Sequence, residues 1–258
     1  MERIANLQST YNPFCVIDEE KSLADARESE KRWQNGNPLG LMDGVPSTIK
    51  DLMLSRGWPT LKGSKTIARD QNWNDDAPIV ARMREEGAVF VGKTTTPEFG
   101  WKGVTDSPLT GSTRNPWDPS RTPGGSSGGA AVAAALGMGH FNIGSDGGGS
   151  IRMPAGFCGV FGLKATFGLV PAYPQSTMGT LSHQGPMTRT VQDAARMLNT
   201  ITRPDHRDWY SAPYRKLDYE ASLKNDVRGI KIAFSPTLGY ATVDPLVSKK
   251  VQDAVKIF

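Results

Sequence analysis

The sequence predicts an α/β fold, because strand-like and helix-like segments alternate along the chain. Short apolar segments such as 88–91 (AVFV) and 140–143 (HFNI) are typical of buried strands. Apolar residues at helical spacing follow, as in 191–201. No internal repeat or low-complexity block interrupts this alternation. The 258 residues suit one core, so a single domain over 1–258 is expected.

Each element is predicted from local start signals, stop signals and apolar patterns. The first half of the chain is expected to hold a charged surface helix at 19–34, a short strand within 44–53 that ends in a turn at Lys50-Asp51, a helix capped by Asp75 or Asp76 and stopped by Gly87, and a strand at 88–91. An alanine-rich helix at 130–137 and a strand at 140–143 follow. The last expected elements are a helix opened by a Thr190 and Asp193 capping box, a strand at 230–234 and a helix from Asp244-Pro245. That last helix keeps an apolar stripe up to Phe258 without a stop signal, so we expect the fold to lack its C-terminal portion.

Composition excludes several classes of protein. The net charge of +4 comes without a cluster of basic residues, so no nucleic-acid partner is expected. No apolar stretch approaches the ~18 residues of a membrane span, and the N-terminus has no signal-peptide core. The two cysteines, Cys15 and Cys158, lack metal-ligand spacing. We therefore expect a cytoplasmic protein that has no membrane contact and no metal or cofactor.

Three short motifs compete for the chemistry, and each lacks its context. Residues 87–94 match the phosphate-binding pattern G-x-x-x-x-G-K-[ST], but the predicted strand lies inside the pattern instead of before it. Residues 124–128 match G-x-S-x-G, although no strand precedes them. Residues 47–50 match S-x-x-K, yet the partner motifs of penicillin-recognising enzymes occur here in inverted order. All three interpretations are disfavoured.

Two serines in glycine-rich runs indicate nucleophilic chemistry. Ser150 closes GSDGGGS at 144–150, and Ser126 lies 150 − 126 = 24 residues earlier in PGGSSGG. A run of glycines lets successive backbone N–H groups turn toward one point, which creates an anion-binding concavity beside a hydroxyl. The sequence therefore indicates an enzyme that attacks carbonyl groups.

The segments GVPSTIKD, RTPGGSSGGAAVAAALG and GSDGGGSIRMPAGFCGVFGLKAT resemble the amidase signature family in order and in the spacing of the serines. The likeness continues through 179–198. This resemblance implies a large mixed β-sheet flanked by helices and a Ser-cisSer-Lys triad. Ser150 would be the nucleophile, Ser126 the bridging serine after a cis peptide bond from Gly125, and Lys50 the base.

The chemistry that this resemblance implies is hydrolysis of a linear carboxamide through an acyl-enzyme. Lysine accepts a proton only when neutral, so Lys50 needs burial or nearby positive charge to lower its pKa. Backbone N–H groups of Gly147, Gly148 and Gly149 would hold the oxyanion. An aryl or acyl group of the substrate is expected near the aromatic segment 98–103.

Two alternatives stay open, namely an inactive fragment and a glutamine-hydrolysing amidotransferase subunit. Many family members, including such subunits, carry threonine where this chain has Gly147, and DGGGS is more similar to stand-alone amidases. Family members are also typically about twice as long. The expected partner is a small amide, and a homodimer is left open.

Overall fold

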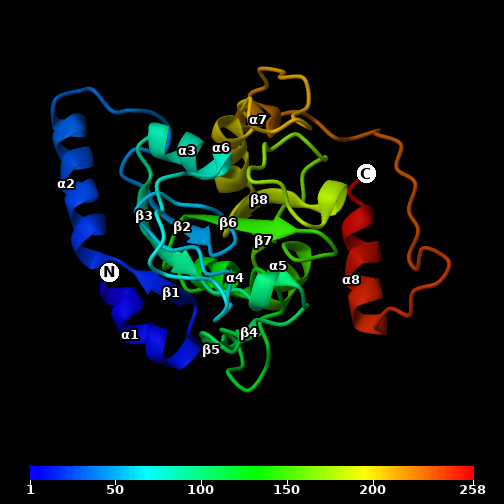
Figure 1. Cartoon of the computed structure of the whole chain (residues 1–258). Coiled ribbons are helices and arrows are strands. Elements are labelled where there is room, and N and C mark those ends of the chain that lie inside the picture. The colour runs from blue at the N-terminus through cyan, green and yellow to red at the C-terminus, as the bar shows by residue number, and fades with distance from the viewer. The chain divides into compact units, whose positions relative to one another are not determined.

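A mixed six-stranded sheet lies at the centre of the unit Met1–Glu220 (Figure 1). The computed structural model describes residues 1–258. In spatial order the strands are β1 (Phe14–Ile17), β3 (Val89–Thr94), β2 (Pro46–Lys50), β6 (Phe141–Asp146), β8 (His183–Thr188) and β7 (Phe161–Gly162). Strand β2 runs parallel to β3 and β6, whereas β1, β8 and β7 pair in antiparallel fashion. The α/β prediction with a mixed sheet is confirmed.

Helices cover both faces of the sheet (Figure 1). On one face, α3 (Pro78–Glu85) and α6 (Val191–Ile201) bury Ile79 and Met197 in a core that includes Ile49 and Phe90 of the strands. On the other face, α4 (Gly128–Ala135) and α5 (Arg152–Cys158) share a second core with Met187 of β8. Because successive strand side chains point to opposite faces, each central strand contributes to both layers.

The other elements of the chain lie around this sheet or after it in sequence. They are α1 (Glu2–Tyr11), α2 (Glu19–Gln34), the short 3₁₀ helices η1 (Glu98–Gly100) and η2 (Gly179–Leu181), a small two-stranded sheet of β4 (Asp106–Ser107) and β5 (Gly111–Ser112), α7 (Tyr219–Ser222) and α8 (Pro245–Val255). None of the helices combines the length and the apolar character that crossing a bilayer requires.

Helix-capping signals give mixed results. Helix α2 covers the predicted 19–34, and Thr190 caps α6 by accepting the N–H of Asp193 at 3.1 Å. Helix α3, however, has no side-chain cap. Neither of the two predicted caps, Asp75 and Asp76, caps this helix, and Asp76 instead forms an ion pair with Arg84 at 2.8 Å.

The strand predicted at 230–234 is wrong. This segment belongs to the second unit, Ala221–Phe258, and its backbone pairs with no other strand. Ile230, Ile232 and Phe234 are each more than 40% exposed, at 51%, 46% and 42%. Alternating apolar residues form a strand only where a neighbouring strand takes up the backbone hydrogen bonds. Helix α8 begins after Asp244 as predicted, and Asp244 caps it.

Candidate active site

Lys50 lies at the carboxyl end of β2, next to the carboxyl end of the parallel strand β6. Ile49 points into the core with α3 and α6, so the alternation of the strand turns Lys50 toward α4 on the opposite face. There the Lys50 side chain is fully buried, with 0% exposure. The turn predicted at Lys50-Asp51 thus places an amine inside the protein, not on its surface.

Three serine hydroxyls surround the Lys50 amine. Its Nζ lies 2.7 Å from Ser126 Oγ, 2.8 Å from Ser127 Oγ and 2.9 Å from Ser145 Oγ. Ser126 and Ser127 lie immediately before α4, and Ser145 is near the end of β6. The peptide bond between Gly125 and Ser126 is cis. The structure therefore brings Lys50 and Ser126 into direct hydrogen-bond contact.

Burial lowers the pKa of Lys50 well below its ordinary value of 10.5, because the interior disfavours the ammonium form. The negative charge of Asp146 opposes this shift and raises the pKa. No carboxylate touches the Lys50 amine, since all three of its hydrogen-bond partners are hydroxyls. The lowered pKa favours the neutral amine, which is the form that can accept a proton from a serine.

Ser150 follows the glycine loop at the same end of β6, and its side chain is half-buried. Its carbonyl oxygen accepts the N–H of Ser127 at 3.2 Å, which ties the Ser150 backbone to the start of α4. The hydroxyls of Ser150 and Ser126 are not hydrogen-bonded to each other in this structure. Lys50 and Ser126 are therefore in contact, whereas the contact between Ser126 and Ser150 that the family resemblance implies is not formed here.

Asp146 holds the glycine loop in shape. Its buried carboxylate accepts the N–H groups of Gly149 at 2.7 Å and Ile151 at 3.2 Å, and Arg152 binds both of its oxygens at 2.9 Å. Burial alone would raise the pKa of Asp146, but these bonds together hold it well below its usual range. The Gly149 N–H is thus already used within the loop.

The other two glycines of the predicted oxyanion site have free N–H groups. Gly147 and Gly148 donate to no group of the chain. A side chain at Gly147 would lie 2.7 Å from the sulfur of Met178, so Met178 occupies the space that a larger residue at this position would need. Nothing lies within 4 Å of the corresponding position at Gly148, which leaves that peptide accessible.

The segment 98–104 runs directly beside Ser126. A side chain at Gly100 would lie 3.4 Å from Ser126 Oγ, and one at Gly125 would meet the backbone of Val104 at 2.6 Å. Phe99 and Trp101 of this segment are 50% and 80% exposed. Exposed aromatic residues therefore lie immediately before and after Gly100, the residue next to Ser126.

Lys93 has a different role from the one that the phosphate-binding pattern suggests. It lies within β3, fully buried, and its amine contacts Asp51 Oδ1 at 2.8 Å and Thr60 Oγ1 at 2.6 Å. A phosphate-binding lysine has to reach an open loop. The pattern at 87–94 is a buried strand with an internal ion pair, so the nucleotide-binding interpretation has no support.

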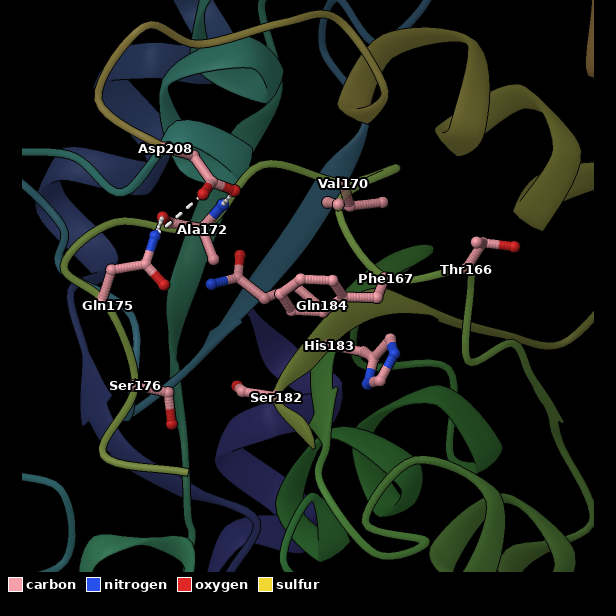
Figure 2. A pocket seen from close by; sticks show the side chains of 11 residues that line it. Thr166, Phe167, Val170, Ala172, Gln175, Ser176, Ser182, His183, Gln184 and Asp208 are labelled. Carbon is pink, nitrogen blue, oxygen red and sulfur yellow. Dashed lines mark hydrogen bonds between the residues drawn. The ribbon is translucent and has the colours of Figure 1, made fainter. Parts of the chain in front are cut away.

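A small polar pocket lies near the turn that precedes β8 (Figure 2). Gln175 donates to Asp208 at 2.8 Å, while the carbonyl oxygen of the Gln184 side chain is buried without a hydrogen-bond partner. The volume of about 10 Å³ corresponds to about one water molecule. This pocket is too small for an amide substrate. His183 beside it contacts the backbone oxygens of Leu181 and Asp146 at 2.8 and 3.2 Å.

Comparisons with known proteins agree with this fold. The family model described as Amidase matches residues 1–258, so the chain belongs to the amidase signature family. An acylamidase from Rhodococcus erythropolis is 41% identical over 259 residues, which cover 100% of this chain and 54% of that protein. A glutamyl-tRNA(Gln) amidotransferase subunit from Desulforudis audaxviator is 39% identical over 261 residues, covering 100% of the chain and 52% of the relative.

A solved structure gives the same result. A bacterial aryl acylamidase of the amidase signature family superposes with a TM-score of 0.91 at 32% identity, over 99% of this chain and 53% of that one. The chain thus spans about half the length of the relatives that it matches. The family predicted from the sequence motifs is confirmed.

Proposed function

We propose that this chain carries the catalytic hydroxyls and base of an amidohydrolase that cleaves linear carboxamides. The observation that supports the proposal is the buried Lys50 amine, 2.7 Å from Ser126 Oγ and surrounded by hydroxyls alone. A neutral amine held in this way is suited to receive a proton from Ser126. A metal is not needed for this chemistry.

In the proposed acylation, the Oγ–H bond of Ser150 breaks as its oxygen attacks the amide carbonyl. Ser126 takes that proton and gives its own to Lys50, so that Ser126 is neutral before and after the step. The carbonyl π electrons move to the oxygen, which becomes an oxyanion. Collapse of this intermediate expels the amine, which receives the proton back from Lys50 through Ser126. Water then attacks the acyl-enzyme carbonyl and passes a proton through Ser126 to Lys50. Collapse breaks the ester bond to Ser150, releases the carboxylic acid and returns that proton through Ser126 to the Ser150 oxygen.

We assign oxyanion binding to the free N–H groups of Gly147 and Gly148. Gly149, the third predicted donor, supports the loop through Asp146 in this structure and binds the oxyanion only if that 2.7 Å bond is exchanged. Loss of one oxyanion donor typically raises the barrier by about 3 kcal/mol. The loop therefore combines two free donors with one that fixes their orientation.

For the substrate we propose an N-aryl or N-alkyl acylamide. The exposed Phe99 and Trp101 lie on the segment that passes Ser126, and an acylamidase is among the relatives. The second candidate is glutamine hydrolysis within an amidotransferase, which the 39% identity to such subunits favours. Acylamide hydrolysis by the chain alone supports the first candidate. Glutamine-dependent ammonia release that needs ATP and partner subunits supports the second.

The triad is tested by labelling the chain with a fluorophosphonate probe and mapping the adduct by mass spectrometry. We expect the adduct on Ser150, and we expect Ser126→Ala and Lys50→Ala each to slow labelling by about 100-fold or more, which is typical for loss of general base catalysis. The matched control is Ser47→Ala, because Ser47 is a buried serine of the same strand as Lys50 that only bonds Val45 O.

Two outcomes would contradict this proposal. An adduct confined to Ser126 would make Ser126 the nucleophile and exclude the relay. Labelling of Ser150 at the same rate in the wild type and in Lys50→Ala would remove lysine from the mechanism. The cytoplasmic location and a homodimer stay predictions.

A further inference from the structure

The Lys50 amine has three hydroxyl neighbours, whereas the proposed relay uses one of them. Ser126, Ser127 and Ser145 all lie within 2.9 Å of Nζ. A neutral amine has two N–H groups and one lone pair, so each of these contacts has a direction that the chemistry can assign. The inference below rests on the proposed function, in which Lys50 acts as the neutral base.

Ser127 has no proton to give to Lys50. Its hydroxyl donates to the carbonyl oxygen of Ser145 at 3.1 Å, and its oxygen accepts the backbone N–H of Ser145 at 3.2 Å. A hydroxyl has one hydrogen and two lone pairs, so one lone pair remains. Ser127 therefore accepts one N–H of the Lys50 amine.

The other N–H and the lone pair of the amine are shared between Ser126 and Ser145. If Ser145 donated its proton to Nζ, the lone pair would be occupied and Ser126 could only accept. Lys50 would then be unable to take the proton of Ser126. If Ser145 accepts the second N–H, the lone pair faces the Ser126 hydroxyl, and proton transfer is possible.

We propose that Ser145 is a positioning residue that sets the direction of proton transfer at Lys50. Its oxygen accepts the second N–H of the neutral amine, and Ser126 donates to the lone pair. When the Ser126 O–H bond breaks and a third N–H bond forms, the resulting ammonium has one oxygen for each of its three N–H groups. Ser145 is half-buried, so its hydroxyl is able to donate its proton to a water molecule while its oxygen accepts from Lys50.

Ser145→Ala removes one of the two fixed acceptors. The neutral amine then keeps one N–H for Ser127, and the other is left without a partner unless it is donated to Ser126. Because an unpaired buried donor is unfavourable, the amine is expected to donate to Ser126, which blocks the relay. Ser145→Thr keeps the hydroxyl and is expected to restore the wild-type arrangement.

The experiment measures the rate at which a fluorophosphonate labels Ser150 as a function of pH. For Ser145→Ala we expect a plateau at least about tenfold below the wild type. We also expect the midpoint of the acidic limb at lower pH, because the ammonium loses one acceptor. Ser145→Thr should stay within about threefold of the wild type. Ser47 is a buried serine three positions before Lys50, and Ser47→Ala should change neither the plateau nor the midpoint.

The outcomes separate this inference from the proposed function. A Ser145→Ala variant with the plateau and midpoint of Ser47→Ala overturns the role of Ser145. Wild-type labelling that is absent from Ser150 or insensitive to Lys50→Ala overturns the proposed function instead. In that case the titration of the Lys50 amine, followed by ¹⁵N NMR, decides: a lower midpoint in Ser145→Ala supports the hydrogen bond, and an equal midpoint overturns it.

Discussion

Replacing Lys50 with methionine tests the neutral amine without any substrate. The pKa of Lys50 in the folded chain lies well below 10.5 because the side chain is buried. Between that folded value and 10.5 the unfolded chain binds one more proton than the folded chain, so raising the pH stabilises the fold. A difference of one bound proton between the two states changes the free energy of unfolding by about 1.4 kcal/mol per pH unit. Methionine fills a similar volume and cannot titrate, so Lys50→Met should lose this contribution.

The measurement is the free energy of unfolding in urea from about pH 7 to about pH 8.5. Across this window the slope of the wild type should exceed that of Lys50→Met by up to about 2 kcal/mol in total. Buried thiols limit the window from above: burial raises the pKa of Cys158 to about 12, so the unfolded thiol ionises first above its ordinary value of 9.0 and stability falls. Lys93 is present in both the wild type and Lys50→Met, so its contribution cancels in the difference between their slopes.

Parallel pH curves for the wild type and Lys50→Met would refute this reasoning. They would mean that Lys50 binds the same number of protons in both states, so that the folded chain holds an ammonium. Lys65→Met serves as the control, because Lys65 is exposed. Its curve should follow that of the wild type over the whole window.

Three further substitutions test individual contacts. Lys93→Met leaves the Asp51 carboxylate, 3% exposed, without its partner at 2.8 Å, and should lower the free energy of unfolding by about 3–5 kcal/mol in urea titrations. Arg152→Gln removes a bond to each oxygen of Asp146, so the freed negative charge should raise the pKa of Lys50 and move the acidic limb of Ser150 labelling to higher pH. Thr190→Ala removes the cap of α6 and should cost about 1 kcal/mol in thermal unfolding, with an unchanged value counting against the capping bond.

The sequence predicts those elements that carry their own signals. Helix α2 has a cap and a charged surface, and α8 begins with Asp-Pro, so both were predictable from local residues. Strand β8 was not, because Gly185 and Pro186 interrupt its apolar pattern. It forms because β6 and β7 pair on either side of it, which is information outside the segment. The same dependence on a neighbour explains the wrong strand at 230–234.

For the candidate site, the sequence motifs indicate Lys50, Ser126 and Ser150 but not Ser145. The contact of Ser145 with Lys50 depends on β2 and β6 lying side by side and parallel, which brings their carboxyl ends to the same edge of the sheet. Sequence order alone does not give that neighbour relation. The orientation of Ser150 is also beyond the motif, since spacing says nothing about side-chain rotation.

The two buried lysines show why the surroundings of a lysine, not the motif, distinguish the proposed base. Lys50 and Lys93 lie on adjacent parallel strands, and burial lowers the pKa of both. Lys93 contacts the carboxylate of Asp51, which stabilises its ammonium form. Lys50 contacts only hydroxyls, which serve an ammonium and a neutral amine equally well because a hydroxyl both donates and accepts. A site that has to hold both protonation states within one reaction cycle therefore needs serines around the amine, and a carboxylate in direct contact would keep the proton on it.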